Sequence, residues 1–417
     1  MFATEDRSYG SCLGRRTILS NGIEVHTVCG DVWKDMAIRV VVDVGRYSDG
    51  DRPGATHLLE HLLLSHEIRG QRPRMDTVTT RGFHVGGQTR DTHTEYVLTG
   101  PSDQAGEGIR LVLGALFNPV WSEAHFAVEQ GIVFQEEREK AAPWRVQGAW
   151  IRSTYPVLAP FFHDQDARRH TMDRIRELHT THYGPAVTRV FYAGRGTHQD
   201  IVEAVASVAV PETTGRASPR ITVPDLHPGR FHISEPHDEH TSVNFVWPTR
   251  PRWASSEVWS ALAGWTYGLL YRRLRFDLGV LYKANLHDLN FFPQKVCSVR
   301  LLTRPEHLET VERVSEDLFE ELRSVRIPSW LADAIAAEKN EEEDDEGGNR
   351  KPAAYRSPSS IVALMHGQED GRRESASARK TEKPERDDRA PSDPDRIRDE
   401  ARRLLDPAKQ ATAIIAP

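Results

Sequence analysis

The chain has 417 residues with a formal net charge of −7, and hydrophobic residues make up 38% of it. This length exceeds what one hydrophobic core organises and predicts two domains of roughly 200 residues each. The net charge gives no electrostatic reason to expect nucleic acid or a membrane as partner, and no run reaches the roughly 18 apolar residues of a membrane-spanning helix. Three isolated cysteines without CxxC spacing argue against a disulfide framework, so we expect a reducing, cytoplasmic setting.

The first half predicts an alternation of strands and helices. β-branched segments at 22–28 and 36–45 indicate strands, and a polar loop then leads to an amphipathic helix that contains residues 57–67. Further expected elements are a turn and strand at 82–100, helices at 105–116 and about 122–141, and a helix, turn and strand at 174–194.

A segment rich in Pro, Thr, Ser and Gly at 211–229 is the predicted linker. It separates an N-terminal domain, 1–210, from a C-terminal domain, 230–417, whose elements follow a similar order. That repeated order predicts two related α+β domains. In the second domain, about 338–394 is strongly charged, so we expect part solvated helix and part disordered loop, with the acidic run 341–346 as a solvated face.

The predicted helix at 57–67 carries the sequence "HLLEH", in which Glu60 lies between His57 and His61. Positions i and i+4 lie on one face of a helix, so both imidazoles can bind the same metal ion. Glu60 is near enough to reach a water beside that ion as general base without binding the ion itself. This HxxEH order is the inverzincin signature, although two protein ligands leave a catalytic zinc site one ligand short.

The segment "VEQGIVFQEEREK" offers the third ligand. Glu129 and Glu136 are seven residues apart, two helical turns, and therefore share a helix face. One of them can bind the metal while the other orients a ligand or the water. The residues alone leave open the alternative that both are ordinary glutamates on a solvated face.

Together these segments resemble the pitrilysin-type inverzincin metallopeptidases, which include mitochondrial processing peptidase and insulin-degrading enzyme. The resemblance extends over essentially the whole chain and is carried by "LSNGIEV", "VDVGRYSDGDRPGATHLLEHLLL" and "GFHVGGQTRDTHTEY". In the family, the third zinc ligand lies about 75 residues after the second histidine, with another glutamate seven residues before it. Glu136 follows His61 by 75 residues, so the resemblance implies one Zn²⁺ per chain, held by His57, His61 and Glu136, with Glu129 as a supporting catalytic residue.

The resemblance also implies the fold: two related domains, each a mostly antiparallel sheet packed with helices. In the second domain, "LYRRLRFDLGVLY" is similar to a family segment in which an arginine and a tyrosine assist peptide binding, here Arg275 and Tyr282. Both side chains can donate a hydrogen bond to a peptide carbonyl or a developing oxyanion. The alternative is an ordinary junction between a helix and a strand.

The sequence departs from the family at two adjacent positions of the expected substrate-binding strand. Where many relatives have Asn-Ala, this chain has Gly86-Gly87. Two glycines keep the main-chain groups that dock an extended peptide but make a strand edge more flexible. We therefore expect altered substrate selection or weaker binding.

The expected function is a zinc endopeptidase that hydrolyses unfolded peptides or a leader sequence, with Glu60 as general base. The chain is half as long as the four-domain relatives, so the resemblance implies a homodimer or a heterodimer with a related subunit. The alternative is a weakly active or non-catalytic subunit of a heterodimeric processing peptidase, acting in peptide binding or assembly.

Overall fold

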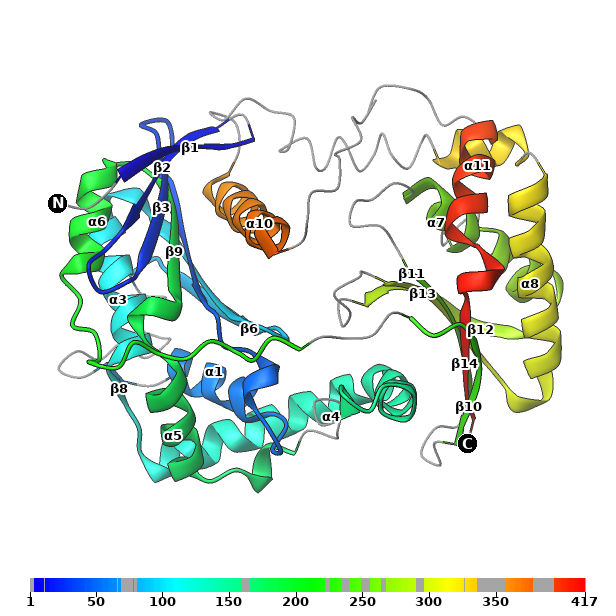
Figure 1. The fold of residues 1–417 in the computed structure, drawn as a ribbon, viewed down its shortest axis with the longest axis horizontal. Coiled ribbons are helices and arrows are strands. Elements are labelled where there is room, and N and C mark those ends of the chain that lie inside the picture. The colour runs from blue at the N-terminus through cyan, green and yellow to red at the C-terminus, as the bar shows by residue number, and fades with distance from the viewer. Residues whose placement is uncertain are drawn as a thin grey trace. The chain divides into compact units, whose positions relative to one another are not determined.

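The computed structural model of the chain describes residues 4–10, 12–65, 67–68, 78, 81–159, 166–221, 226–234, 240–248, 256–263, 268–289, 296–325, 327–335, 357–377 and 394–416. The chain divides into two compact units. The first comprises 1–139, 164–220 and 346–383, and the second comprises 140–163, 221–345 and 384–417. Each unit combines a sheet with packed helices, so the predicted α+β class is confirmed (Figure 1).

The two units exchange segments along the chain. The predicted linker at 211–229 spans the division between Arg220 and Ile221. Residues 140–163, from the first half, nevertheless belong to the second unit, and residues 346–383 belong to the first. The observed units therefore differ at these two segments from the contiguous domains 1–210 and 230–417.

A seven-stranded sheet in the order β1-β2-β3-β9-β4-β7-β6 forms the first unit's framework. Its strands are β1 (Thr4–Tyr9), β2 (Cys12–Ile18), β3 (Glu24–Cys29), β4 (Asp35–Val42), β6 (His84–Thr89), β7 (Thr94–Pro101) and β9 (Thr188–Gly194). Only the β3–β9 pairing in this sheet is parallel. β6 is an edge strand, since no described strand pairs with its outer side. A separate antiparallel pair consists of β5 (Glu67–Ile68) and β8 (Pro119–Val120).

Helices cover both faces of this sheet (Figure 1). They are α1 (Ala55–Ser65), α3 (Ala105–Phe117), the first part of α4 (Glu123–Thr154), α5 (Met172–His182), α6 (His198–Ala206) and α10 (Pro358–Ser377). Alternate residues of the strands point to opposite faces. Ile38 and Val40 of β4 enter the core shared with α1, α3, α5 and α6, whereas Ala37 and Val41 pack against α10.

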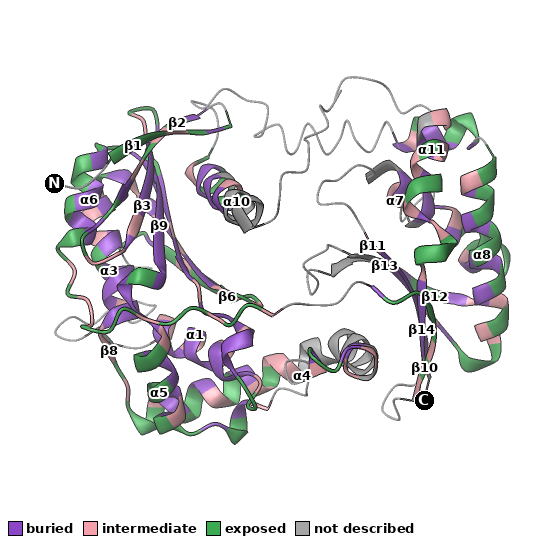
Figure 2. Cartoon of the chain, in the orientation of Figure 1, coloured by how far each residue is buried: buried purple, intermediate pink, exposed green. Residues whose placement is uncertain are grey.

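α10 lies inside the segment 338–394 that the sequence predicted to be solvated or disordered. It buries Ile361, Val362 and Met365 against Phe191 of β9 and neighbouring strand residues. Figure 2 shows this buried face beside the largely buried strands. The expectation was incomplete because an amphipathic helix needs few apolar residues when a distant sheet covers them. Residues 338–356, which include 341–346, and residues 378–393 lie outside the described residues.

The second unit contains a five-stranded sheet in the order β10-β14-β11-β13-β12. Its strands are β10 (Gly229–Ser234), β11 (Thr241–Pro248), β12 (Leu281–Leu289), β13 (Val296–Thr303) and β14 (Ala411–Ala416). The β10–β14 pairing is parallel and the others are antiparallel. Its described helices include α7 (Ser256–Ala263), the π-helical turn η6 (Tyr271–Asp277), α8 (Leu308–Ser324) and α11 (Pro394–Leu404).

The second unit's sheet is also packed on both faces. Phe245 and Trp247 of β11 join residues of α7, α8 and α11 in one core. Ile151 near the end of α4 and the following Tyr155 join Val246 in another. The described part of the chain also contains short 3₁₀ turns: η1 (Arg46–Ser48), η2 (Ser102–Gln104), η4 (Ala167–Arg169), η5 (Pro185–Val187), η7 (Pro305–His307) and η9 (Pro407–Lys409). None of the described helices combines the length and apolar character needed to cross a membrane.

Candidate metal-dependent active site

The helix α1 is fixed at its beginning by Asp49. The carboxylate of Asp49 accepts hydrogen bonds from the backbone N–H of Gly54 (2.8 Å) and of Thr56 (2.7 Å), and from the Thr56 hydroxyl. These bonds satisfy donors that a helix N-terminus leaves without partners. The helix then buries a row of leucines: Leu58, Leu59, Leu62 and Leu63. This packing leaves His57 and His61 on the half-buried side of the helix.

The structure brings His57, His61 and Glu136 together. His57 Nε2 lies 3.8 Å from Glu136 Oε2, and His61 Nε2 lies 3.7 Å from Glu136 Oε1. One ligand atom from each residue lies within 4.8 Å of the other two. Bonds of about 2.1 Å in a tetrahedral zinc site separate ligand atoms by roughly 3.4 Å, so small side-chain movements suffice for coordination. Two imidazoles and a carboxylate form a donor set that suits zinc.

Glu129 lies on the side of His61 that faces away from Glu136. Its Oε2 is 3.4 Å from His61 Nδ1, and its Oε1 is 3.6 Å from Nε2 of His125. Burial raises the pKa of Glu129, but interactions with His125, His61 and Ser65 outweigh burial and lower that pKa to about 2. Glu129 is therefore ionised, and its Oε2 can accept a hydrogen bond from a protonated Nδ1 of His61.

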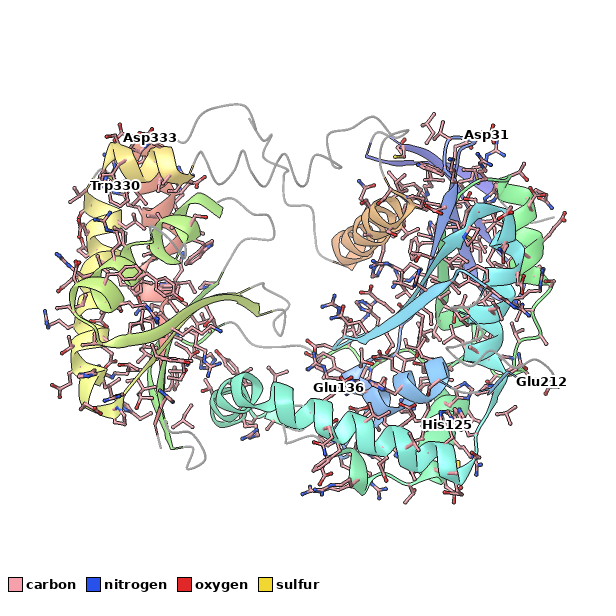
Figure 3. All side chains as sticks on the ribbon, turned by 180° about the vertical axis from the view of Figure 1, so that it is seen from behind. Asp31, His125, Glu136, Glu212, Trp330 and Asp333 are labelled. Carbon is pink, nitrogen blue, oxygen red and sulfur yellow. The ribbon has the colours of Figure 1, made fainter. Side chains whose placement is uncertain are left out.

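His125 is a neighbour of the site that the sequence reading missed. It precedes Glu129 by four residues on α4, and its Nε2 is 2.9 Å from the Ser65 hydroxyl. Ser65 in turn donates a 2.7 Å hydrogen bond to the carbonyl of His61. Figure 3 labels His125 and Glu136, both on α4 beside α1. The one-turn spacing of His125 and Glu129 was a signal that could have found it.

Glu60 is buried beside the histidines, with 5% of the residue exposed. Its Oε2 accepts a 2.6 Å hydrogen bond from the Thr89 hydroxyl on β6. A Cβ placed on Gly87, two residues before Thr89, would come within 2.6 Å of Glu60 Oε1 and 2.8 Å of Leu64 Cδ1. β6 thus contacts the Glu60 carboxylate at two places: the Thr89 hydroxyl donates to Oε2, and Gly87, which has no side chain, lies close to Oε1.

The two glycines of β6 differ in their surroundings. A Cβ on Gly86 would meet no heavy atom within 4 Å, in contrast to the close approach at Gly87. Both residues are exposed on the edge strand of the sheet. Gly86 therefore has room for a side chain, whereas Gly87 is restricted by Glu60. The sequence predicts one shared role in substrate docking for both glycines and does not reveal this difference.

Arg275 and Tyr282 meet in the second unit. The guanidinium of Arg275, on the π-helical turn η6, donates a hydrogen bond to the main-chain carbonyl of Tyr282 on β12. The β12–β13 register shifts between Leu281 and Lys283, so Tyr282 is the extra residue of a bulge on an edge strand. Bulges redirect side chains, and 63% of Tyr282 is exposed.

A second group with ligand atoms in metal-binding range consists of His93, Glu95 and His366. Glu95 Oε1 lies 3.2 Å from His93 Nε2, while Oε2 accepts a 2.6 Å hydrogen bond from Arg39. Arg90 Nε is 3.6 Å from Oε1. Burial raises the pKa of Glu95, but His93, Arg39 and His366 outweigh burial and lower it to about 2. With two guanidinium groups at one carboxylate, a divalent cation would be repelled, and we assign an ion-pair cluster here.

Part of the chain is similar to one known protein family. Residues 169–340 match the model described as Peptidase M16 inactive domain. That range does not include His57, His61 or Glu136, so the match carries no information on these candidate metal ligands. No curated protein sequence matches the chain.

Several solved structures share the fold over nearly the whole chain. A protease from Helicobacter pylori is 16% identical with a TM-score of 0.71, covering 97% of this chain and 99% of its own. A peptidase M16 inactive domain from Pseudomonas fluorescens is 15% identical with a TM-score of 0.71, covering 97% and 98%. A mutant of the ferredoxin protease FusC, in complex with Arabidopsis ferredoxin, is 10% identical with a TM-score of 0.68, covering 99% of this chain and 46% of its own. At these identities the likeness establishes the fold: the chain has the two-unit α+β architecture of M16-like peptidases.

Proposed function

We propose that the chain is a zinc-dependent endopeptidase of the pitrilysin type that hydrolyses unfolded peptides or a leader segment. The main support is the approach of His57, His61 and Glu136, whose ligand atoms lie within 4.8 Å of one another. A second support is the buried carboxylate of Glu60, the sequence neighbour of His61, which would serve as general base.

Each residue of the centre has a separate task in this proposal. His57, His61 and Glu136 would hold the ion, which when bound polarises the scissile carbonyl and lowers the pKa of a water. Glu60 accepts a proton from the attacking water through Oε1, because Oε2 is engaged by Thr89. Glu60 then returns a proton to the leaving amine.

The edge strand β6 is the proposed docking position for substrate. An extended peptide can add to an exposed sheet edge through main-chain hydrogen bonds. β6 ends at Thr89, whose side chain contacts the general base, so a peptide paired with β6 would pass Glu60. Pairing of this kind selects unfolded segments, because folded proteins have their backbone groups engaged.

We also propose that the chain acts as a homodimer or as a heterodimer with a related subunit. The chain corresponds to 46% of the length of the ferredoxin protease that it resembles in fold. Two chains together would therefore match the length of that longer protein. Arg275 and Tyr282 of one chain would bind substrate at the metal centre of the partner chain.

The competing function is a non-catalytic subunit that binds peptides or supports assembly. The observation in its favour is the match to a model described as an inactive domain. Removal of zinc with a chelator distinguishes the two functions. The peptidase loses cleavage of a mixed peptide library when zinc is removed and regains it with one equivalent of zinc per chain. A binding subunit retains peptide binding, measured by fluorescence anisotropy, and cleaves nothing in either state.

A further inference from the structure

Both histidines of the centre have the same orientation toward the carboxylates around them. Their Nε2 atoms face Glu136, so their Nδ1 atoms point to the rear of the site. Behind His61 lies Glu129, 3.4 Å from Nδ1. Behind His57 lies Glu137, whose Oε1 is 3.7 Å from His57 Nδ1. Each imidazole thus lies between a carboxylate at the front and a carboxylate at the rear.

Glu137 can occupy this position because it follows Glu136 on α4. Successive residues of a helix project about 100° apart, so the two carboxylates reach His57 from different sides. The second oxygen of Glu137, Oε2, accepts a 3.2 Å hydrogen bond from the backbone N–H of Ala167. The side chain of Gln130, also on α4, donates a 3.0 Å hydrogen bond to the carbonyl of Ala167 and so ties that segment to the helix.

The Oε1 atom of Glu137 is buried, and His57 is the neighbour that could donate a hydrogen bond to it. The Glu137 side chain is 8% exposed, and its buried Oε1 accepts no hydrogen bond within the part of the chain that the structure describes. Burial of an acceptor without a donor costs free energy, more so when the group is charged. A proton on His57 Nδ1 would provide the missing donor.

We propose that Glu137 is a positioning residue that holds His57 in the tautomer with Nδ1 protonated and Nε2 free to bind metal. This inference rests on the metal centre of the proposed function. Carboxylates behind a ligating histidine fix its ring and tautomer, and their loss costs 10- to 100-fold in metal affinity. Glu137 thereby does for His57 what Glu129 does for His61.

Two variants separate this role from a structural one. Glu137→Gln keeps the volume and an oxygen that can accept the Ala167 N–H, but it turns an amide donor toward His57 Nδ1. Glu137→Ala removes both interactions. Glu123 is an exposed glutamate at the beginning of the same helix, so Glu123→Gln is the matched control for the loss of one charge.

The test measures zinc affinity by competition with a chromophoric chelator, together with the thermal unfolding of the metal-free protein. We expect Glu137→Gln to bind zinc about 10- to 100-fold more weakly with an unchanged unfolding midpoint, and Glu123→Gln to match the wild type. Nitrogen NMR of histidine-labelled, zinc-loaded wild type should show His57 protonated at Nδ1.

Wild-type affinity in Glu137→Gln would overturn the positioning role and leave the proposed function intact. A loss of affinity that only accompanies a lower unfolding midpoint would also overturn it, since Glu137 would then act through the fold. A wild-type protein that binds no zinc would overturn both proposals.

Discussion

Thr89 and Glu60 connect the edge strand β6 to the helix α1. The hydroxyl of Thr89 on β6 donates a 2.6 Å hydrogen bond to Oε2 of Glu60 on α1. This bond fixes a carboxylate that would otherwise rotate freely about its terminal torsion. It also couples the proposed substrate-docking strand to the proposed general base.

Removal of the Thr89 hydroxyl should lower kcat more than it raises KM, because the bond orients Glu60 and touches no substrate. We expect Thr89→Val to lose roughly 10- to 100-fold in kcat, within the range that misplacement of a catalytic group produces. Thr89→Ser keeps the donor and should recover most of that loss. Steady-state cleavage of one fluorogenic peptide measures both constants. A kcat for Thr89→Val equal to that of the wild type would show that this hydrogen bond does not orient Glu60 for catalysis.

Gly86 and Gly87 should respond differently to the same substitution. In Gly87→Ala the new methyl group would meet Glu60 Oε1 at 2.6 Å, so the carboxylate has to move away from its bond with Thr89. We expect kcat to fall by about tenfold or more, while stability changes by less than about 2 kcal/mol because a flexible side-chain end gives way. Gly86→Ala is the matched control, with open space around its Cβ. Indistinguishable kcat values for the two variants would contradict the proposed restriction at Gly87.

The ion-pair cluster around Glu95 should make stability depend on acid pH. The pKa of Glu95 falls from 4.5 to about 2 on folding, because bonds and charges from His93, Arg39 and His366 outweigh the opposite effect of burial. The stabilisation is therefore complete above the unfolded-state pKa and is lost as pH falls from 4.5 toward 2. This pKa shift corresponds to a contribution of about 3 kcal/mol to the free energy of unfolding.

Glu95→Gln tests this dependence by thermal unfolding at a series of pH values. The variant should be less stable than the wild type near neutrality, since Arg39 loses its charged partner. That difference should shrink as the pH falls below about 4, where the wild type also loses the carboxylate charge. A difference that stays constant with pH would show that Glu95 contributes through packing alone.

Mixed dimers should recover activity if two chains share each site. Glu60→Gln inactivates one chain, and the double variant Arg275→Ala with Tyr282→Ala inactivates the other. Random pairing of the two would give about one quarter of the wild-type number of intact sites. We expect cleavage near that level after the two are unfolded and refolded together. Mixtures as inactive as either variant alone would place Arg275 and Tyr282 outside the shared site.

The sequence was most informative where chemistry follows from local periodicity. The i, i+4 spacing of His57 and His61 placed both on one helix face, and a seven-residue spacing did the same for Glu129 and Glu136. Family resemblance joined the two helices across the intervening residues. The predicted α+β class followed from the alternating elements and is confirmed.

Contacts that depend on long-range packing were beyond the sequence. The approach of Gly87 to Glu60 exists because β6 lies beside α1, and periodicity within either element does not contain that information. The approach of Glu137 to His57 Nδ1 depends likewise on how α4 packs against α1, which the sequence of either helix does not contain. α10 was read as a charged segment because the strands that bury it, including β4 and β9, lie far away in the chain.

The central claim is tested most directly by a comparison of wild type with Glu60→Gln, purified side by side, for zinc content and peptide cleavage. The proposed function predicts one zinc per chain in both proteins and cleavage of an unstructured peptide library by the wild type alone. Equal cleavage by the two proteins, or zinc-loaded wild type that cleaves no peptide in the library, would contradict it.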